Sequence, residues 1–391
     1  MRSWRGCLMV LALTYAPSGS AQEAKLEAQR IQADVLGVDS HNDTLQRVLI
    51  ENVDIGQRLP DGTIDIPRLQ EGGIHVPFFA LWVPTYYKGS EAVRRTLDLR
   101  DAMQRVLDKY PDRIEVATSA GDIERIVGQK RIAAVLTVEG GHQIDNDLAV
   151  LRMYHRMGIL SMTLTHFRSN DWADSSTGKQ EHNGLTDFGK DVVREMNRIG
   201  MIVDISHVSD KTFYDVLQVT SKPVIASHSS CRSISDIPRN MTDDMMRALA
   251  RNGGVVGINF GAYFLNQQDA GELIRNIAIE NALEPTVTGA ELDKFAAKKH
   301  AENGESHPHV GHATVEDAAA CIDHVAKVAG VDHVGIGSDF DGIRAVPSGL
   351  EDVSKISNLT EALIKRGYTT PDIQKIMGGN FLRVIREVVG Q

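Results

Sequence analysis

The chain has 391 residues and a formal net charge of −10, with 52 acidic against 42 basic residues. This acidic balance argues against binding to nucleic acid or to anionic membrane surfaces, which both require basic protein surfaces. Three cysteines are too few for a disulfide framework in a chain of this length. We expect Cys231 and Cys321 to be separate buried thiols.

Residues 1–21 are typical of a secretory signal peptide. Arg2 and Arg5 precede an apolar segment at 7–15, and the small residues at 19–21 offer a cleavage site. The apolar segment is short for a membrane span. We therefore expect a secreted or periplasmic protein without stable membrane association after signal cleavage. Removing the two arginines changes the formal charge from −10 to −12.

Residues 22–391 are expected to form one domain, because no linker composition divides them. Short β-branched apolar runs alternate with amphipathic stretches, which predicts βα units and a parallel sheet. About eight such runs occur, as an α/β fold of the (β/α)₈ TIM barrel type requires. The predicted strands are 35–40, 75–83, 132–138, 159–165, 201–206, 223–227, 254–259 and 333–338.

Three of the connecting helices have clear terminal signals. Thr186 is expected to cap a helix that has an apolar stripe and ends at Gly200. A second apolar stripe predicts a helix over 314–329. Near the end of the chain, Thr370 is expected to act as a cap and Pro371 to lie in the first turn.

The segment 264–311 does not fit the alternation and forms an insertion between the seventh and eighth strands. Insertions at such connections lie on the catalytic face of a barrel, so a lid over the site is one interpretation. A solvated helical appendage fits the composition equally well. Because their spacing is irregular, we interpret the four histidines of this region as solvated surface residues: His300, His307, His309 and His312.

Metal-capable side chains follow six of the predicted strands. In an extended strand, residues two apart point to the same face, so His41 and Asp43 can reach one ion together. A barrel gathers the carboxyl ends of its strands around one mouth, where barrel enzymes place their chemistry. Each residue alone is more often structural than functional, but their joint occurrence predicts a site. The other strand-end residues are Glu139, His166, His207, His228 and Asp339.

These residues supply more ligands than a single catalytic zinc needs, since such a zinc usually keeps three protein ligands. Two divalent ions sharing one carboxylate, with a hydroxide between them as the nucleophile, fit the set better. Glu139 precedes Gly140 and Gly141, which allow close backbone approach. It is the expected bridging ligand.

The chain resembles the membrane (renal-type) dipeptidase family of zinc peptidases, within the metal-dependent amidohydrolase superfamily. The first and last matching motifs lie at Asp39 and Phe381, so the resemblance covers nearly all of the mature chain, and the combination of motifs is specific. The matching stretches are 39–43, 92–97, 138–142, 163–166, 204–209, 227–230, 239–240, 337–342 and 378–381.

The resemblance implies two Zn²⁺ per chain and dipeptide substrates. It implies that one zinc binds His41 and Asp43, the other binds His207 and His228, and Glu139 binds both. It further implies that His166 contacts the scissile carbonyl, that Arg239 binds the free carboxylate of the substrate, and that Asp339 transfers protons. Tyr263 either assists Arg239 or packs in the core. Asp341, two residues after Asp339, is expected to brace the following turn instead.

Two features depart from the family pattern. The cysteine pattern of the mammalian members is missing, so their disulfides and lipid anchor are not expected here. The insertion at 264–311 is unlike the compact members, which leaves the substrate side chains and stereochemistry open. A homodimer is compatible with the sequence, which does not define the oligomeric state.

Three functions therefore remain after the sequence analysis. The favoured one is an exported dinuclear zinc dipeptidase. A second keeps the barrel and the metals but hydrolyses another amide or lactone, such as an N-acyl amino acid or a β-lactam. A third is a catalytically silent metal- or peptide-binding protein, which the complete ligand set and Asp339 disfavour.

Overall fold

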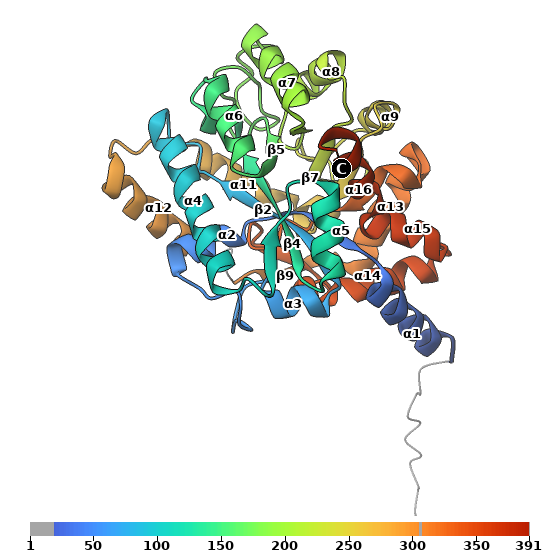
Figure 1. The fold of residues 1–391 in the computed structure, drawn as a ribbon. Coiled ribbons are helices and arrows are strands. Elements are labelled where there is room, and N and C mark those ends of the chain that lie inside the picture. Colours follow the sequence, from blue (N-terminus) through green and yellow to red (C-terminus); the bar gives the residue numbers. More distant parts are fainter. Residues whose placement is uncertain (1–18, 305–306, 391) are drawn as a thin grey trace, which may run out of the picture.

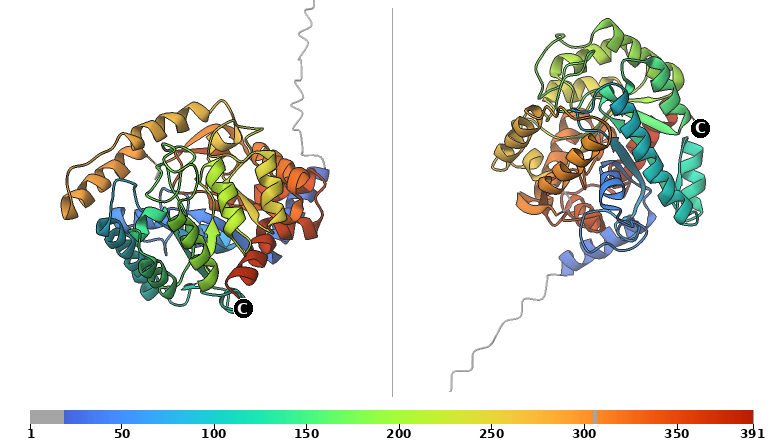
Figure 2. Two further views of the ribbon diagram at one scale, coloured as in Figure 1. Left: turned by 90° about the horizontal axis from the view of Figure 1, so that it is seen from above. Right: turned by 90° about the vertical axis from the view of Figure 1, so that its left-hand side faces the viewer.

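The computed structural model describes residues 19–304 and 307–390, which contain a nearly closed barrel of eight parallel strands surrounded by helices (Figures 1 and 2). Each of the eight predicted strands is present, within a few residues of its expected bounds, and the predicted fold class is confirmed. In the order of pairing, the strands are β1 (Gly37–Asn42), β2 (Ile74–Trp82), β4 (Ile132–Glu139), β5 (Ile159–Thr163), β6 (Ile202–Asp204), β7 (Ile225–Ser229), β8 (Val255–Ile258) and β10 (Val334–Ile336).

The last strand returns to the first through residues just beyond their ends. Asn42 forms a parallel bridge with Phe340, and the backbone N–H of Asp339 donates to the carbonyl of His41 at 3.1 Å. This contact brings two predicted site segments together at the barrel mouth.

Helices form the outer ring, as Figure 1 shows around β2 and β4. The ring and the N-terminal helix consist of α1 (Gly19–Asp34), α2 (Thr44–Gln46), α3 (Ile66–Glu71), α4 (Ser90–Lys109), α5 (Ala120–Gly128), α6 (Leu148–Arg156), α7 (Asp187–Ile199), α8 (Asp210–Val219), α9 (Asp243–Arg251), α13 (Val315–Ala329), α14 (Ile356–Lys365), α15 (Thr370–Gln374) and α16 (Asn380–Val388). Short 3₁₀- and π-helical segments are η1 (Arg47–Glu51), η2 (Gly141–Ile144), η3 (Val331–His333), η4 (Val353–Lys355) and η5 (Lys375–Gly379).

The predicted helix signals are confirmed at α7 and α13 and shifted at α15. Thr186 caps α7, and Gly200 ends it in the left-handed conformation. The cap of α15 is Thr369, because its side chain accepts from the backbone N–H of Asp372. The expectation for Thr370 was therefore wrong by one residue: the hydroxyl of Thr369 also donates to the carboxylate of Asp372, three residues on, whereas Thr370 has Ile373 at that spacing.

One short strand was not anticipated. β3 (Ile114–Val116) pairs with β4 outside the closed ring. Three residues are too few to show an alternating pattern, so this strand could not be predicted from the sequence.

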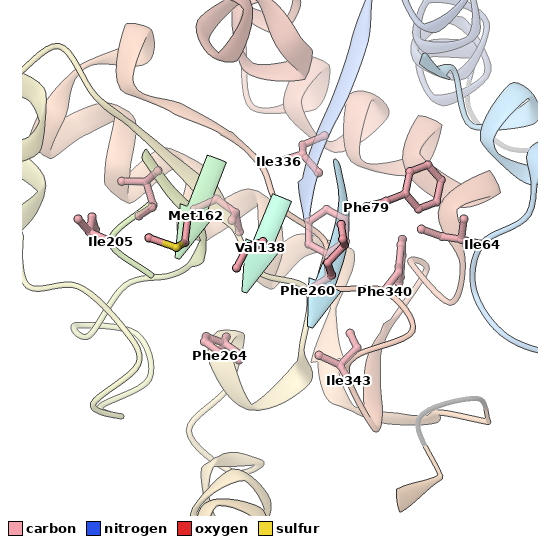
Figure 3. Packing of buried hydrophobic residues seen from close by; sticks show 14 of the residues in the cluster. Ile64, Phe79, Val138, Met162, Ile205, Phe260, Phe264, Ile336, Phe340 and Ile343 are labelled. Carbon is pink, nitrogen blue, oxygen red and sulfur yellow. The ribbon is translucent and has the colours of Figure 1, made fainter. Parts of the chain in front are cut away.

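Buried apolar side chains pack against the strands, as Figure 3 shows. Val138 on β4 and Met162 on β5 are paired neighbours in the sheet. Phe260 and Phe340 make an edge contact with ring centroids 5.8 Å apart, and both are fully buried. Since Phe340 also joins the last strand to the first, its packing stabilises the closure that positions the site.

The insertion forms a layer of its own at one side of the barrel, where Figure 2 shows its helices projecting from the body. It consists of α10 (Ala262–Leu265), α11 (Ala270–Asn281), α12 (Gly289–Asn303) and β9 (His309–Thr314), which pairs with β11 (Ala345–Ser348).

Polar contacts attach the two long insertion helices to the barrel. Arg94 of α4 binds Asp293 of α12 at 2.7 Å, and Tyr87 donates to the same carboxylate at 2.9 Å. The guanidinium of Arg168 donates to three carbonyls at the end of α11, those of Glu280, Asn281 and Leu283.

The insertion histidines divide into two groups. His307, His309 and His312 are exposed, as expected. The same expectation was wrong for His300, which is buried and lies 2.7 Å from a carboxylate oxygen of Glu51. The ion pair joins α12 to η1, a contact between segments far apart in sequence that spacing alone does not reveal.

Three further expectations concern the cysteines, the signal peptide and membrane-spanning helices. Cys231 and Cys321 are buried free thiols, as predicted. Residues 1–18 of the expected signal peptide lie outside the described residues, and 19–21 begin α1. Within 19–304 and 307–390, no helix is long and apolar enough to cross a membrane.

Candidate metal centre

The seven polar residues predicted at the strand ends meet at one mouth of the barrel. His41 lies in β1, Glu139 ends β4 and His228 lies in β7. All seven residues are buried, and each is at most 9% exposed. The remaining four follow β1, β5, β6 and β10: Asp43, His166, His207 and Asp339.

Glu139 is central to the cluster, because its two carboxylate oxygens face different histidines. Oε2 lies 3.3 Å from Nε2 of His41. Oε1 lies 3.1 Å from Nε2 of His207 and 3.2 Å from Nε2 of His228. One carboxylate therefore presents a separate oxygen to each of two ligand sets.

The set around His41 contains two further carboxylates. Its Nε2 lies 3.5 Å from Oδ2 of Asp43 and 3.9 Å from Oδ1 of Asp339. The potential ligand atoms form three overlapping groups in which all atoms lie within 4.8 Å of one another. These groups are His41, Glu139 and His228; Glu139, His166 and His207; and His41, Asp43 and Asp339.

Several of these polar atoms are buried without a hydrogen-bond partner. They include both ring nitrogens of His41, Oδ1 of Asp43 and Nδ1 of His207. Buried polar atoms in folded proteins are normally satisfied, and nitrogen and carboxylate oxygen donors are the ligands of zinc and its divalent neighbours. The residues therefore fit a metal site.

The pKa values of the buried residues in the cluster also favour the binding of cations. Burial raises the pKa of Asp43 to about 6 and the pKa of Asp339 to about 7. Burial lowers the pKa of His207 and His228 well below the usual range, and nearby cationic groups add to this effect. These two imidazoles are thus neutral donors, whereas the pKa of His41 is raised, because the carboxylates of Glu139 and Asp43 outweigh its burial. The carboxylates need a cation beside them to remain ionised in this buried position.

A hydrogen-bond chain orients His228. The hydroxyl of Ser227 donates to Oδ2 of Asp204 at 2.5 Å and lies 2.8 Å from Nδ1 of His228. Because that hydroxyl proton is used by Asp204, Ser227 accepts from the Nδ1–H of His228. The lone pair of the ring is then on Nε2, which faces Glu139, and this is the arrangement that supports metal binding.

The two aspartates after β10 have different surroundings. The side-chain amide of Asn259 donates to Oδ2 of Asp339 at 2.8 Å, which fixes this carboxylate in the site. The carboxylate of Asp341 points elsewhere and accepts hydrogen bonds from Thr63 and Thr44 at 2.7 to 2.8 Å. Asp341 therefore braces neighbouring segments, as the sequence predicted.

The turn after these aspartates requires glycine. A Cβ atom at Gly342 would lie 2.1 Å from Oδ2 of Asp43 and 2.8 Å from Oδ1 of Asp339. Any side chain here would displace two carboxylates of the cluster.

Next to the cluster lies a pocket whose walls include Asp43, Glu139, His166, His207 and Asp339. Arg239 is buried at its wall, donates to the carbonyl of His228 at 3.1 Å and lies 5.3 Å from the centroid of the Phe264 ring. Burial lowers its pKa to about 10, so it stays cationic. Tyr263 lines the same pocket.

His166 stands between the cluster and the insertion. Its Nε2 lies 3.9 Å from Oε1 of Glu139, and its Nδ1 lies 3.7 Å from Oε1 of Glu280 on α11. Burial lowers its pKa well below the usual range. The ring also lies 5.4 Å, between centroids, from that of Trp82 at the end of β2.

Some residues that line the pocket or contact the cluster, as Asn259 does, were not predicted. Asn259 and Trp82 lie at the ends of predicted strands, so the same strand-end rule could have found them. Glu280 and Asn276 belong to the insertion and had no distinguishing pattern. Gln46 and Arg344 also line the pocket.

Comparison with known proteins assigns the family. The model of the membrane dipeptidase family, peptidase family M19, matches residues 25–390. Dipeptidase tcpJ of Claviceps purpurea is 37% identical over 337 residues, which are 84% of this chain and 69% of that protein. Dipeptidase 3 of Mus musculus is 34% identical over 372 residues, which are 93% of this chain and 66% of that protein.

Solved structures agree with this assignment. The crystal structure of the probable dipeptidase PvdM from Pseudomonas aeruginosa superposes with a TM-score of 0.76 at 25% identity, covering 94% of this chain and 98% of that one. The expected family and enzyme class are confirmed: the chain belongs to the membrane dipeptidase family, peptidase family M19.

Proposed function

We propose that this chain hydrolyses the peptide bond of dipeptides with two zinc ions. His41 and Asp43 hold one ion, His207 and His228 hold the other, and Glu139 is shared. The observation that carries the proposal is the orientation of Glu139, whose two oxygens face the two histidine sets separately. Imidazole and carboxylate donors suit zinc, although they also suit its divalent neighbours.

When bound, such a pair of ions supplies a water of lowered pKa and polarises the substrate carbonyl. Asp339 is placed to accept a proton from that water and to deliver one to the leaving amine. Asn259 holds its Oδ2, while Oδ1 faces the His41 set. A carboxylate within reach of both reacting groups can perform the two transfers in succession.

The substrate is oriented by groups at opposite sides of the cluster. Arg239 presents a buried guanidinium to the pocket and can pair with a terminal carboxylate, with Tyr263 beside it. His166 lines the same pocket close to Glu139, where it can contact the carbonyl of the scissile bond. These positions favour a short substrate with a free C-terminus.

We also propose that the protein is exported, which follows from the character of residues 1–21, and that it works in the periplasm or outside the cell. Whether it forms a homodimer is a separate prediction, tested by light scattering of the purified protein. A mass of one chain would contradict the dimer.

The function is tested with a panel of dipeptides, their C-terminal amides, N-acyl amino acids and a β-lactam, each with added zinc. Separation of the products by chromatography should show cleavage of free dipeptides and poor cleavage of the amides. Preferential turnover of N-acyl amino acids or the lactam would favour the other amidohydrolase function. No turnover of any compound by metal-loaded protein would favour the silent binding protein.

A further inference from the structure

A second pocket adjoins the metal pocket and is here called the side chamber. The two share five wall residues, and the zone that these residues line is here called the passage: Gln46, Trp82, Asn276, Glu280 and Arg344. Beyond this passage the walls are largely apolar and come from η1, the segment after β2, and the insertion helices. They include Ile50, Pro84, Tyr86, Ile279, Leu283 and Ala296.

The charged residues of the side chamber are mostly neutralised by partners within the protein. Lys299 pairs with Glu302 at 2.7 Å, and His300 pairs with Glu51 at 2.7 Å. Arg344 donates to the side chain of Asn276 at 2.6 Å. Beyond the passage, the chamber therefore offers an apolar surface rather than a charged one to an incoming group.

The barrel topology places the side chamber across the mouth from Arg239. Trp82, in the passage, ends β2, whereas Arg239 follows β7 and donates to a residue of that strand. In the closed order of eight strands, β2 is second and β7 is sixth, so they lie on opposite sides of the ring. Neither Arg239 nor Tyr263 borders the chamber.

We propose that the side chamber is the subsite for a large apolar side chain on the amino-terminal residue of the dipeptide. This inference rests on the proposed function, because it uses Arg239 as the anchor of the C-terminus. With the carboxylate held on the β7 side and the scissile bond over the metals, the amino-terminal residue extends toward β2. The passage there leads its side chain into the chamber.

The size of the expected preference follows from apolar burial. Burying a leucine or phenylalanine side chain favours binding by a factor of about 10 to 100 relative to leaving it in water. We expect kcat/KM for Phe-Ala and Leu-Ala to exceed that for Ala-Ala by about tenfold or more. The reversed dipeptides Ala-Phe and Ala-Leu should gain nothing from the chamber. Equal values for Phe-Ala and Ala-Ala in the wild-type enzyme would overturn the proposal.

Helix α11 offers a matched pair of positions for the test. Ile279 lines the chamber and is 57% exposed, while Ile274 is 56% exposed and lines neither pocket. Because both are exposed on the same helix, Ile279→Trp and Ile274→Trp should fold equally well. Ala296→Phe narrows the chamber from α12, with exposed Ala301→Phe as its control on that helix.

The measured quantity is the ratio of kcat/KM for Phe-Ala to kcat/KM for Ala-Ala. Ile279→Trp should lower this ratio by about tenfold, mainly through KM, and Ile274→Trp should leave it at the wild-type value. An unchanged ratio in Ile279→Trp, or an equal loss for Ala-Phe, would overturn the subsite while leaving the dipeptidase function intact. Absence of turnover for every dipeptide would contradict the proposed function and this inference with it.

Discussion

Oε1 of Glu280 lies 3.7 Å from Nδ1 of His166, and both atoms are buried without a hydrogen-bond partner. The carboxyl group comes from α11 of the insertion and the imidazole from the end of β5. Burial raises the pKa of Glu280 to about 7, and on a small approach its protonated carboxyl would donate to Nδ1 and leave Nε2–H of His166 directed at the metal pocket. The insertion thus supplies a residue that can orient a side chain of the barrel.

This relationship predicts different outcomes for two substitutions of Glu280. Glu280→Leu removes the partner of Nδ1 and should lower kcat by about tenfold or more, as losses of orienting partners commonly do. Glu280→Gln should retain most of the activity, because its amide N–H can donate to Nδ1. Steady-state kinetics compare the two variants. Equal losses in both, or none in either, would show that Glu280 does not orient His166.

Arg239 should distinguish free dipeptides from their C-terminal amides. Its guanidinium can form two parallel hydrogen bonds with a carboxylate, and lysine cannot reproduce that geometry. Arg239→Lys should lower kcat/KM for free dipeptides by about 100-fold and reduce the ratio of free acid to amide turnover. A variant that keeps the wild-type ratio would place the carboxylate elsewhere.

Asp339 should be required for catalysis rather than for metal binding. Asp339→Asn keeps the shape and the contact with Asn259 but cannot carry a proton. We expect it to retain about two metals and to bind dipeptide, with kcat lowered by about 100-fold or more. Metal analysis and calorimetric titration accompany the kinetics. Loss of a metal would make Asp339 a ligand, and His166 would become the candidate for proton transfer.

Metal affinity should increase as the pH rises from about 5 to 7. Burial raises the pKa of Asp43 to about 6, so at lower pH the metal-free carboxyl is protonated and a cation must displace that proton. His41, whose pKa is raised, must also lose a proton before its ring nitrogen can bind the ion. His207 and His228, whose pKa values are lowered, are already neutral and release few protons. Calorimetric zinc titrations in buffers of different ionisation enthalpy measure the number of protons released on binding. Affinity that falls with rising pH would contradict this assignment.

The sequence was sufficient to predict the barrel fold and the polar residues at its mouth. Strand-end position identifies them, because parallel strands in a closed barrel place all their carboxyl ends on one side. The same rule separates Asp339 from Asp341: the carboxylate of the first lies in the site, and that of the second bonds to Thr44 and Thr63.

The contributions of the insertion could not be predicted in the same way. Glu280, His300 and the walls of the side chamber acquire their partners through contacts between helices distant in sequence. Helical periodicity indicates which side of a helix is apolar but not which part of the barrel it will contact. The cap of α15 is different, because the local sequence distinguishes the two threonines: Asp372 lies three residues after Thr369, and Ile373 lies three residues after Thr370.

The central claim is that Glu139 joins two metal sites, and elemental analysis of purified wild-type and Glu139→Gln protein tests it most directly. The wild type should contain about two divalent ions per chain in its active form. Because each oxygen of Glu139 faces a different histidine set, Glu139→Gln should weaken both sites and lower the content well below two. One ion per chain with full activity in the wild type, or loss of a single ion in the variant, would contradict the shared carboxylate.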